Sequence, residues 1–298
     1  MKSSLKVQNV CKYIDGFTLS KIDFDIGKGE IFLVGGKNGS GKTKLLETIA
    51  CISLPSEGFI SYFDKTVFND KFNKKNFNVL KQRLGVLIQD ERLFGSLTVN
   101  EIFETYSSFY DVEDHKIYYD DCPHIKDELN KRVETLSDGK KQLTKFLLSI
   151  GHNPDLVFLD EPTSYLDGEV RTWIFSKIDD MRSKGTSFII SLNQFWDICN
   201  IADRLLILEE GTLTNIIPNF KKYYYGSAVK VDKRINLSPI KPSEVYIKIK
   251  KGENKTKIIT KYDINTIKNK LRIKEEDITE FSRPKLEDFY RLRRGDLV

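Results

Sequence analysis

A short stretch of the sequence combines residue types and a spacing that suit phosphate binding. Residues 36–43 read Gly-Lys-Asn-Gly-Ser-Gly-Lys-Thr, which is the pattern G-x-x-x-x-G-K-[ST] of a P-loop. Glycines let such a loop fold back so that successive backbone N–H groups converge on phosphate oxygens. We expect Lys42 to reach the β- and γ-phosphates of a nucleotide and the Thr43 hydroxyl to ligate Mg²⁺. The residues assigned to the nucleotide here are Gly36, Asn38, Gly39, Ser40, Gly41, Lys42, Thr43 and the adjoining Lys44.

Two adjacent carboxylates form a second chemical group. Asp160 and Glu161 directly follow the apolar run 156–159, which predicts a buried strand. Side chains of adjacent residues at a strand end point in different directions, so one carboxylate can hold Mg²⁺ while the other faces the γ-phosphate. We assign Asp160 to the metal and Glu161 to activation of the attacking water. Two acids at a strand end are by themselves usually a solvated turn, but the upstream P-loop favours the functional interpretation.

The elements that must position these residues follow from the hydrophobic pattern. The apolar run at 31–34 predicts a buried strand before the glycine loop, and residues 42–50 predict a helix after it. Strand, loop and helix in this order form the context that the P-loop requires. Two further apolar runs, at 188–190 and 205–208, predict core strands beside the first. Thr98 and Glu101 have the spacing of a capping box, which predicts a helix that begins near Val99.

Composition indicates an ordinary globular protein with an uneven charge distribution. The chain has 298 residues, of which 40% are hydrophobic and 31% charged, and no apolar run approaches the roughly 20 residues of a membrane helix. The net charge is +5, yet residues 211–298 alone carry 21 Lys/Arg and 11 Asp/Glu. This basic region is either a solvated surface or a contact for anionic lipid, nucleic acid or an acidic partner. The four scattered cysteines lack ligand spacing and predict reduced thiols.

The C-terminal part of the chain differs in character from the rest. Residues 245–249 alternate, 252–254 form a turn signal and 257–260 are again extended, which predicts a hairpin. Helices are expected at 263–271 and from Leu286 onward. We therefore predict a nucleotide-binding domain at 1–217 with a helical subdomain at about 95–151, a linker at 218–244, and a small α+β extension at 245–298.

The ordered set of motifs resembles the nucleotide-binding subunit of an ATP-binding cassette (ABC) transporter over residues 1 to about 217. Residues 136–140 read Leu-Ser-Asp-Gly-Lys where that family has its L-S-G-G-Q signature. Gln89 stands at the Q-loop, and Asp167 ends a stretch similar to the D-loop. Tyr13 stands where the family has an aromatic residue that stacks on adenine, with Phe17 as the competing candidate. The resemblance implies an α/β P-loop NTPase (RecA-like) core with an antiparallel β subdomain and a helical subdomain, plus a small α+β C-terminal appendage.

The resemblance also implies a mechanism in which two such domains hold two ATP molecules head to tail. Ser137 and Gly139 would bind the γ-phosphate of ATP held by the partner cassette, which is either an identical or a different chain. The residues implied as catalytic are Glu161, Gln89 and Asn193, and those implied as metal-binding are Thr43, Gln89 and Asp160.

The sequence departs from the family pattern at several positions. Asp138 and Lys140 replace a glycine and a glutamine of the signature, and Lys44 replaces a small hydroxyl residue. The largest departure is Asn193, which stands at the position of the switch histidine. Asparagine can donate a hydrogen bond to the γ-phosphate but cannot carry a positive charge. It predicts impaired or partner-dependent hydrolysis; the alternatives are tolerated variation with Glu161 sufficient, or substitution by Gln194.

The function implied by the resemblance is ATP hydrolysis that drives export of a peptide, an antibiotic or a similar substrate through separate membrane subunits. The stretch Pro-Lys-Leu-Glu-Asp at 284–288 resembles one found near the end of exporter-type cassettes with a C-terminal extension. We expect a cytoplasmic protein that lies on the inner face of the cell membrane through its partners and binds no nucleic acid. The alternative is a nucleotide-gated regulatory or soluble ABC ATPase with low turnover.

Overall fold

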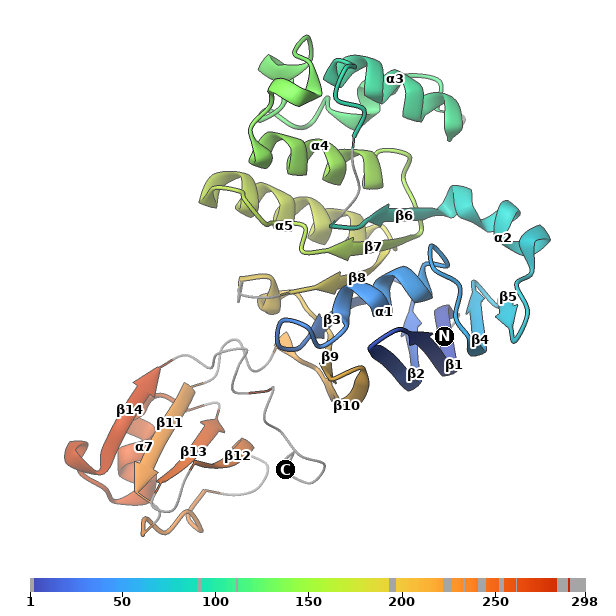
Figure 1. The fold of residues 1–298 in the computed structure, drawn as a ribbon. Helices are drawn as coiled ribbons and strands as arrows, with labels where there is room; N and C mark the ends of the chain where they lie inside the picture. The colour runs from blue at the N-terminus through green and yellow to red at the C-terminus, as the bar shows by residue number, and fades with distance from the viewer. Residues whose placement is uncertain are drawn as a thin grey trace.

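Two β-sheets organise the chain, which we describe from a computed structural model (Figure 1). The structure describes residues 3–89, 93–110, 112–192, 197–221, 227–232, 234–240, 245–251, 255–260, 262–282 and 289. Within these residues, ten strands form a large sheet in the order β5-β4-β1-β2-β10-β9-β3-β8-β7-β6, and four form a smaller sheet in the order β12-β13-β11-β14. Of the described residues, none belongs to a helix that is both long and apolar enough to cross a membrane.

Five parallel strands form one half of the large sheet. In spatial order they are β9 (Arg204–Glu209), β3 (Ile31–Gly35), β8 (Ser187–Ser191), β7 (Leu156–Asp160) and β6 (Leu84–Leu87). Parallel strands bury both faces, and this agrees with their nearly continuous apolar sequences. The residues predicted to bind nucleotide follow the carboxyl ends of these strands, which is where open α/β sheets place ligands.

The other half of the large sheet is mostly antiparallel. It contains β1 (Ser3–Ile14), β2 (Phe17–Gly27), β4 (Glu57–Tyr62), β5 (Lys65–Asn69) and β10 (Thr212–Pro218). Ile22, Phe24 and Ile26 of β2 are buried while the intervening residues are exposed, which confirms the predicted half-buried strand. In this half β1 pairs with both β2 and β4, and β10 joins β2 to β9 of the parallel half.

Five α-helices accompany the large sheet in the described residues. They are α1 (Lys42–Ile49), α2 (Lys74–Leu80), α3 (Val99–Phe109), α4 (Asp138–Ile150) and α5 (Gly168–Ser183). Single 3₁₀ turns lie at Lys81–Arg83, His115–Tyr118, Lys126–Glu128, Val133–Thr135, Asp197–Asn200 and Glu275–Asp277. The capping box that begins α3 is present, with Thr98 and Glu101 bonded reciprocally. In Figure 1, α3, α4 and α5 gather near β6 and β7.

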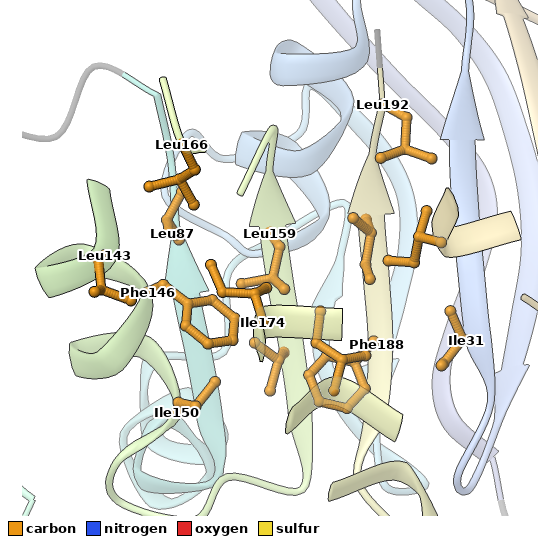
Figure 2. Close-up of a cluster of buried hydrophobic side chains, with 14 of the residues drawn as sticks. Ile31, Leu87, Leu143, Phe146, Ile150, Leu159, Leu166, Ile174, Phe188 and Leu192 are labelled. Atoms are coloured by element: carbon orange, nitrogen blue, oxygen red, sulfur yellow. The ribbon is translucent and has the colours of Figure 1, made fainter. Parts of the chain in front are cut away.

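The apolar core divides between the two faces of the parallel strands. Along β7, Leu159 packs into one cluster and Phe158 into the other, as the period of two requires. On the first face, Phe146 of α4 and Ile174 of α5 point toward Leu159, and Phe188 of β8 extends this layer (Figure 2). The helix α4, which begins within the signature-like stretch, thus belongs to the same core layer as β7, the strand that ends at Asp160, directly before Glu161.

The smaller sheet corrects one prediction. It contains β11 (Ser227–Asp232), β12 (Val245–Lys251), β13 (Lys255–Thr260) and β14 (Ile278–Ser282), with the helix α7 (Ile264–Leu271) packed on one face. The expected hairpin and helix are present. The expectation of a linker throughout 218–244 is wrong, because β11 lies within it and pairs with β13 and β14. The domain boundaries otherwise stay a prediction, and the helix expected from Leu286 lies outside the described residues.

Candidate nucleotide site

The glycine loop is shaped by positions that exclude a side chain. It connects β3 to α1, and Gly41 has a φ of 101° at the N-cap of that helix. A Cβ at Gly41 would lie 2.2 Å from Phe17 Cζ, and one at Gly36 would lie 2.4 Å from the Leu208 carbonyl oxygen. Both positions therefore require glycine. The tight loop brings backbone N–H groups to the start of α1, which is the arrangement that binds phosphate.

Lys42 lies inside this loop with its ammonium group held by the backbone. Its side chain is buried, and Nζ donates to the carbonyl oxygens of Gly36 at 3.0 Å and Lys37 at 3.2 Å. Burial lowers the pKa of Lys42, while the nearby carboxylates of Glu161 and Asp160 act in the opposite direction. Lys42 thus places a positive charge in the phosphate-binding loop, near two carboxylates, where the ammonium group can pair with an anionic ligand.

Asp160 joins the ends of three elements. It is almost fully buried, and its Oδ2 accepts a hydrogen bond of 2.7 Å from Thr43 Oγ1 of α1. Its Oδ1 accepts from Ser191 Oγ, which lies directly opposite in the register of β7 with β8. A hydroxyl and a carboxylate at one point are ligands that Mg²⁺ takes in nucleotide sites. The structure thus brings together Thr43 and Asp160, as the sequence predicts, and the donor set fits this metal.

Glu161 has an unusual backbone conformation that its neighbours hold in place. Its φ is 47°, in the left-handed region that residues with a Cβ seldom adopt. Its N–H donates to Ser191 Oγ at 3.0 Å, and its carbonyl oxygen accepts from Gln142 Nε2 at 3.1 Å. Ser164 Oγ donates to Oε2 of the carboxylate at 3.2 Å. These contacts turn the Glu161 side chain toward the glycine loop.

A pocket of about 360 Å³ lies between these groups. This volume is within the range of small-molecule sites. Ser40, within the same glycine loop, has a buried Oγ without a hydrogen-bond partner among the described residues. The pocket is lined by Phe17, Asn38, Gly39, Gly41, Lys42, Thr43, Lys44, Gln89 and Glu161.

The aromatic residue in this lining is Phe17, the alternative to Tyr13. Tyr13 is 54% exposed, and its hydroxyl donates to Glu57 Oε1 at 3.1 Å. It does not line the pocket, although stacking of Tyr13 on an adenine outside it stays a prediction. Lys44 lines the pocket, and its Nζ lies 2.9 Å from Glu47 Oε2.

The signature-like stretch lies at the start of α4 and away from this pocket. Ser137 is the N-cap, and its Oγ accepts from the Lys140 N–H at 3.3 Å. The helix begins at Asp138, because the Ser137 side chain satisfies an exposed amide of the first turn. The Asp138 side chain is largely exposed. Lys140, which stands in place of the signature glutamine, is turned back to donate to the His124 carbonyl oxygen.

Another predicted residue, Asp167, is also outside the pocket lining. Asp167 is the N-cap of α5, where it accepts from the Val170 N–H at 2.9 Å, and this hydrogen bond lowers the pKa of its carboxyl group. Asn193 and Gln194 lie outside the described residues, so the expectation for the switch position stays a prediction.

Sequence reasoning did not assign roles to Ser191 and Gln142, which contact Asp160 and Glu161 through side-chain and backbone atoms. Ser191 contacts both Asp160 and Glu161, and Gln142 reaches the Glu161 carbonyl from α4. Ser191 had a weak signal, since it is the polar residue that ends the buried run 188–190. Gln142 had none, because only the packing of α4 on β7 places it there.

Comparisons with known proteins agree with this geometry. Residues 19–164 match the family model described as ABC transporter. The chain is 29% identical to an uncharacterized ABC transporter ATP-binding protein of Methanocaldococcus jannaschii, over 71% of this chain and 76% of that protein. It is 28% identical to a probable amino-acid import ATP-binding protein of Bacillus subtilis, over 70% and 86%. An energy-coupling factor transporter ATP-binding protein of Staphylococcus aureus is 27% identical over 66% and 74%.

Solved structures match the fold. A dimeric ATP-binding cassette in a post-hydrolysis state, bound to ADP and Pi, superposes with a TM-score of 0.64 at 20% identity, over 72% of this chain and 98% of that one. The cbiO1 protein of Clostridium perfringens, part of the cbiONQ transporter complex, has a TM-score of 0.59 at 24% identity, over 74% and 90%. At these identities the likeness shows the fold, and it confirms the predicted α/β P-loop NTPase architecture.

Proposed function

This chain contains an ABC transporter ATP-binding domain that is homologous to ABC ATPase cassettes, and we propose its function from that relationship. The chain is the ATP-binding subunit of a transporter, and its enzymatic activity is ATP hydrolysis. The observation that carries the assignment is the convergence of Lys42, Thr43 and Glu161 on one pocket, with Asp160 bonded to Thr43 behind it.

Each of these side chains has a role that its position supports. Lys42 and the loop N–H groups bind the β- and γ-phosphates, and Thr43 with Asp160 would hold Mg²⁺. Bound there, the metal would neutralise charge on the phosphates. Glu161 accepts the proton of the attacking water, and Gln89, in the lining of the same pocket, orients that water and approaches the metal.

A second cassette completes the site in this proposal. Ser137 and Gly139 lie at the start of α4, outside the pocket of their own chain, and are free to meet nucleotide held by a partner. The dimeric cassette bound to ADP and Pi, which shares the fold, supports such an assembly. The partner is either a second copy of this chain or a different cassette.

The cassette pair works with membrane-spanning subunits and lies on the cytoplasmic face of the membrane through them. The complex that contains cbiO1 supports this arrangement. The expectation of export depends on residues 284–288, which lie outside the described residues, and the relatives include proteins named for import. Uptake of substrate by inverted membrane vesicles with ATP outside would support export, whereas ATP-driven release from loaded vesicles would support import.

The function is tested by ATP hydrolysis of the purified complex. Glu161→Gln keeps the shape of the side chain and removes the base, so we expect turnover to fall at least about 100-fold while ATP still binds. Glu276→Gln is the control, because Glu276 is exposed just before β14 of the smaller sheet and pairs with Lys274. Equal turnover of the wild-type and Glu161→Gln complexes would contradict the assignment.

A further inference from the structure

The backbone of Glu161 is held by side chains at both its N–H and its carbonyl group. Ser191 Oγ accepts from its N–H at 3.0 Å, and Gln142 Nε2 donates to its carbonyl oxygen at 3.1 Å. The left-handed φ of 47° costs energy for a residue with a Cβ, so it persists only where surrounding contacts fix it. Loss of either contact removes part of what holds the carboxylate in its orientation.

The donor on the carbonyl side comes from the helix that carries the signature-like stretch. Gln142 lies one turn after Ser137 and Asp138 at the start of α4, and its side chain is 8% exposed. The same turn contacts the segment after β7 at a second point, since a Cβ at Gly139 would lie 2.8 Å from the Tyr165 carbonyl oxygen. The start of α4 and residues 161–166 are therefore joined at two places within one chain.

We propose that Gln142 is a positioning residue that couples the start of α4 to Glu161 of the same chain. The inference rests on the proposed function, in which the start of α4 meets nucleotide held by the partner, whereas Glu161 serves the nucleotide of its own chain. The Gln142–Glu161 hydrogen bond then connects the two sites of a dimer through a single chain. A purely structural alternative is that Gln142 only satisfies a carbonyl group in a partly buried place.

The first test measures the local effect of Gln142→Leu, which keeps most of the volume and removes the donor. We expect kcat of the assembled complex to fall about tenfold with KM for ATP within about twofold, because positioning of Glu161 matters for hydrolysis and not for binding. Gln82→Leu is the matched control, since exposed Gln82 Nε2 donates to the Phe109 carbonyl oxygen at 3.1 Å, away from the pocket. A loss confined to KM, or equal losses in both variants, would overturn the proposal.

The second test separates action on the same chain from action on the partner. Two kinds of mixed cassette pair are prepared. In the first, Gln142→Leu and Glu161→Gln are on the same chain, and in the second they are on opposite chains. If the partner is a different cassette, the equivalent glutamate of that partner is changed in place of Glu161 in the second kind of pair. The rate of the first turnover is compared with that of a pair that carries Glu161→Gln alone. We expect no further loss when both changes share a chain, and about a tenfold loss when they are apart. The reverse pattern, or equal losses, would refute coupling within the chain.

A third measurement needs no activity, so it distinguishes failure of this inference from failure of the proposed function. Hydrogen exchange of residues 156–166 is followed in the full chain. We expect faster exchange of the Glu161 amide in Gln142→Leu and in Gln142→Glu, whose carboxylate cannot donate to the carbonyl group, and wild-type exchange in Gln82→Leu. Unchanged exchange in both Gln142 variants would overturn the proposal even in a chain that hydrolyses no ATP.

Discussion

At the scale of single residues, Lys42 provides a sharp test of nucleotide binding. Lys42→Ala removes the buried ammonium from the glycine loop, so we expect affinity for MgATP to fall at least about tenfold, or about 1.4 kcal/mol. Titration calorimetry of the purified chain measures the change. Lys37→Ala is the control, because that side chain is exposed in the same loop and only its backbone oxygen contacts Lys42. Affinity within about threefold of wild type after Lys42→Ala would contradict the site assignment.

Asn193 carries a prediction that depends on the family resemblance. A histidine at this position could supply a charge-assisted hydrogen bond to the γ-phosphate, worth roughly 1.5–3 kcal/mol or about 10- to 150-fold in rate. We therefore expect Asn193→His to raise ATP turnover of the assembled transporter at least several-fold, with ATP affinity little changed. Flat or reduced turnover would show that the site works with asparagine, and impaired hydrolysis would be rejected.

Much of the site could be predicted at this scale because its chemistry is local in sequence. The P-loop and the pair Asp160–Glu161 are recognisable from adjacent residue types, and the structure brings them to one pocket. Gln142 and Ser191 could not be predicted with their roles, since each acts through a contact between elements. The same reason explains Tyr13 and Phe17, where only the packing against Gly41 shows which ring lines the pocket.

At the scale of elements, Ser191 ties the ends of β7 and β8. Ser191→Ala leaves Asp160 Oδ1 and the Glu161 N–H without this partner, so we expect the free energy of unfolding to fall by about 1–3 kcal/mol and turnover to fall with it. Urea unfolding measures the first effect. Ser183→Ala is the control, because Ser183 Oγ donates to the Asp180 carbonyl oxygen at an exposed helix end. Equal stability losses in both variants would argue against a special role of Ser191.

Strong periodicity made most elements predictable, and the exceptions have physical reasons. The buried runs and the Thr98 capping box correspond to strands and a helix in the structure. The strand β11 was missed because its apolar alternation spans only a few residues and its pairing partners lie far along the chain. Such a strand is stabilised by pairing and burial, which a local pattern does not reveal.

At the scale of the whole molecule, the smaller sheet shares buried side chains with the core of the large sheet. Phe220, Ala228 and Ile259 belong to the same buried cluster as the α4 and α5 residues. Removal of residues 222–298 should therefore leave a chain that binds ATP but unfolds more easily, by about 3–5 kcal/mol from the lost burial. Removal of residues 241–298 should lower solubility more than removal of 222–298, because β11 would remain with both edges unpaired.

Thermal unfolding and size-exclusion chromatography of the two truncated chains, each with and without ATP, measure these effects. The full-length chain is the reference. Equal behaviour of both truncated chains would contradict the argument from strand order, and full stability of the shorter chain would contradict the shared core.

The order of strands in the smaller sheet has a consequence for how the protein is made. β11 leaves the ribosome first, yet its two neighbours, β13 and β14, are synthesised later, and β14 is the last strand of the four. During translation, residues of the large sheet can fold while both edges of β11 are still unpaired. Unpaired strand edges bind other strands and are recognised by chaperones. We expect interrupted synthesis beyond β11 to yield chains that quality control recognises, so only chains translated through β14 would accumulate for assembly.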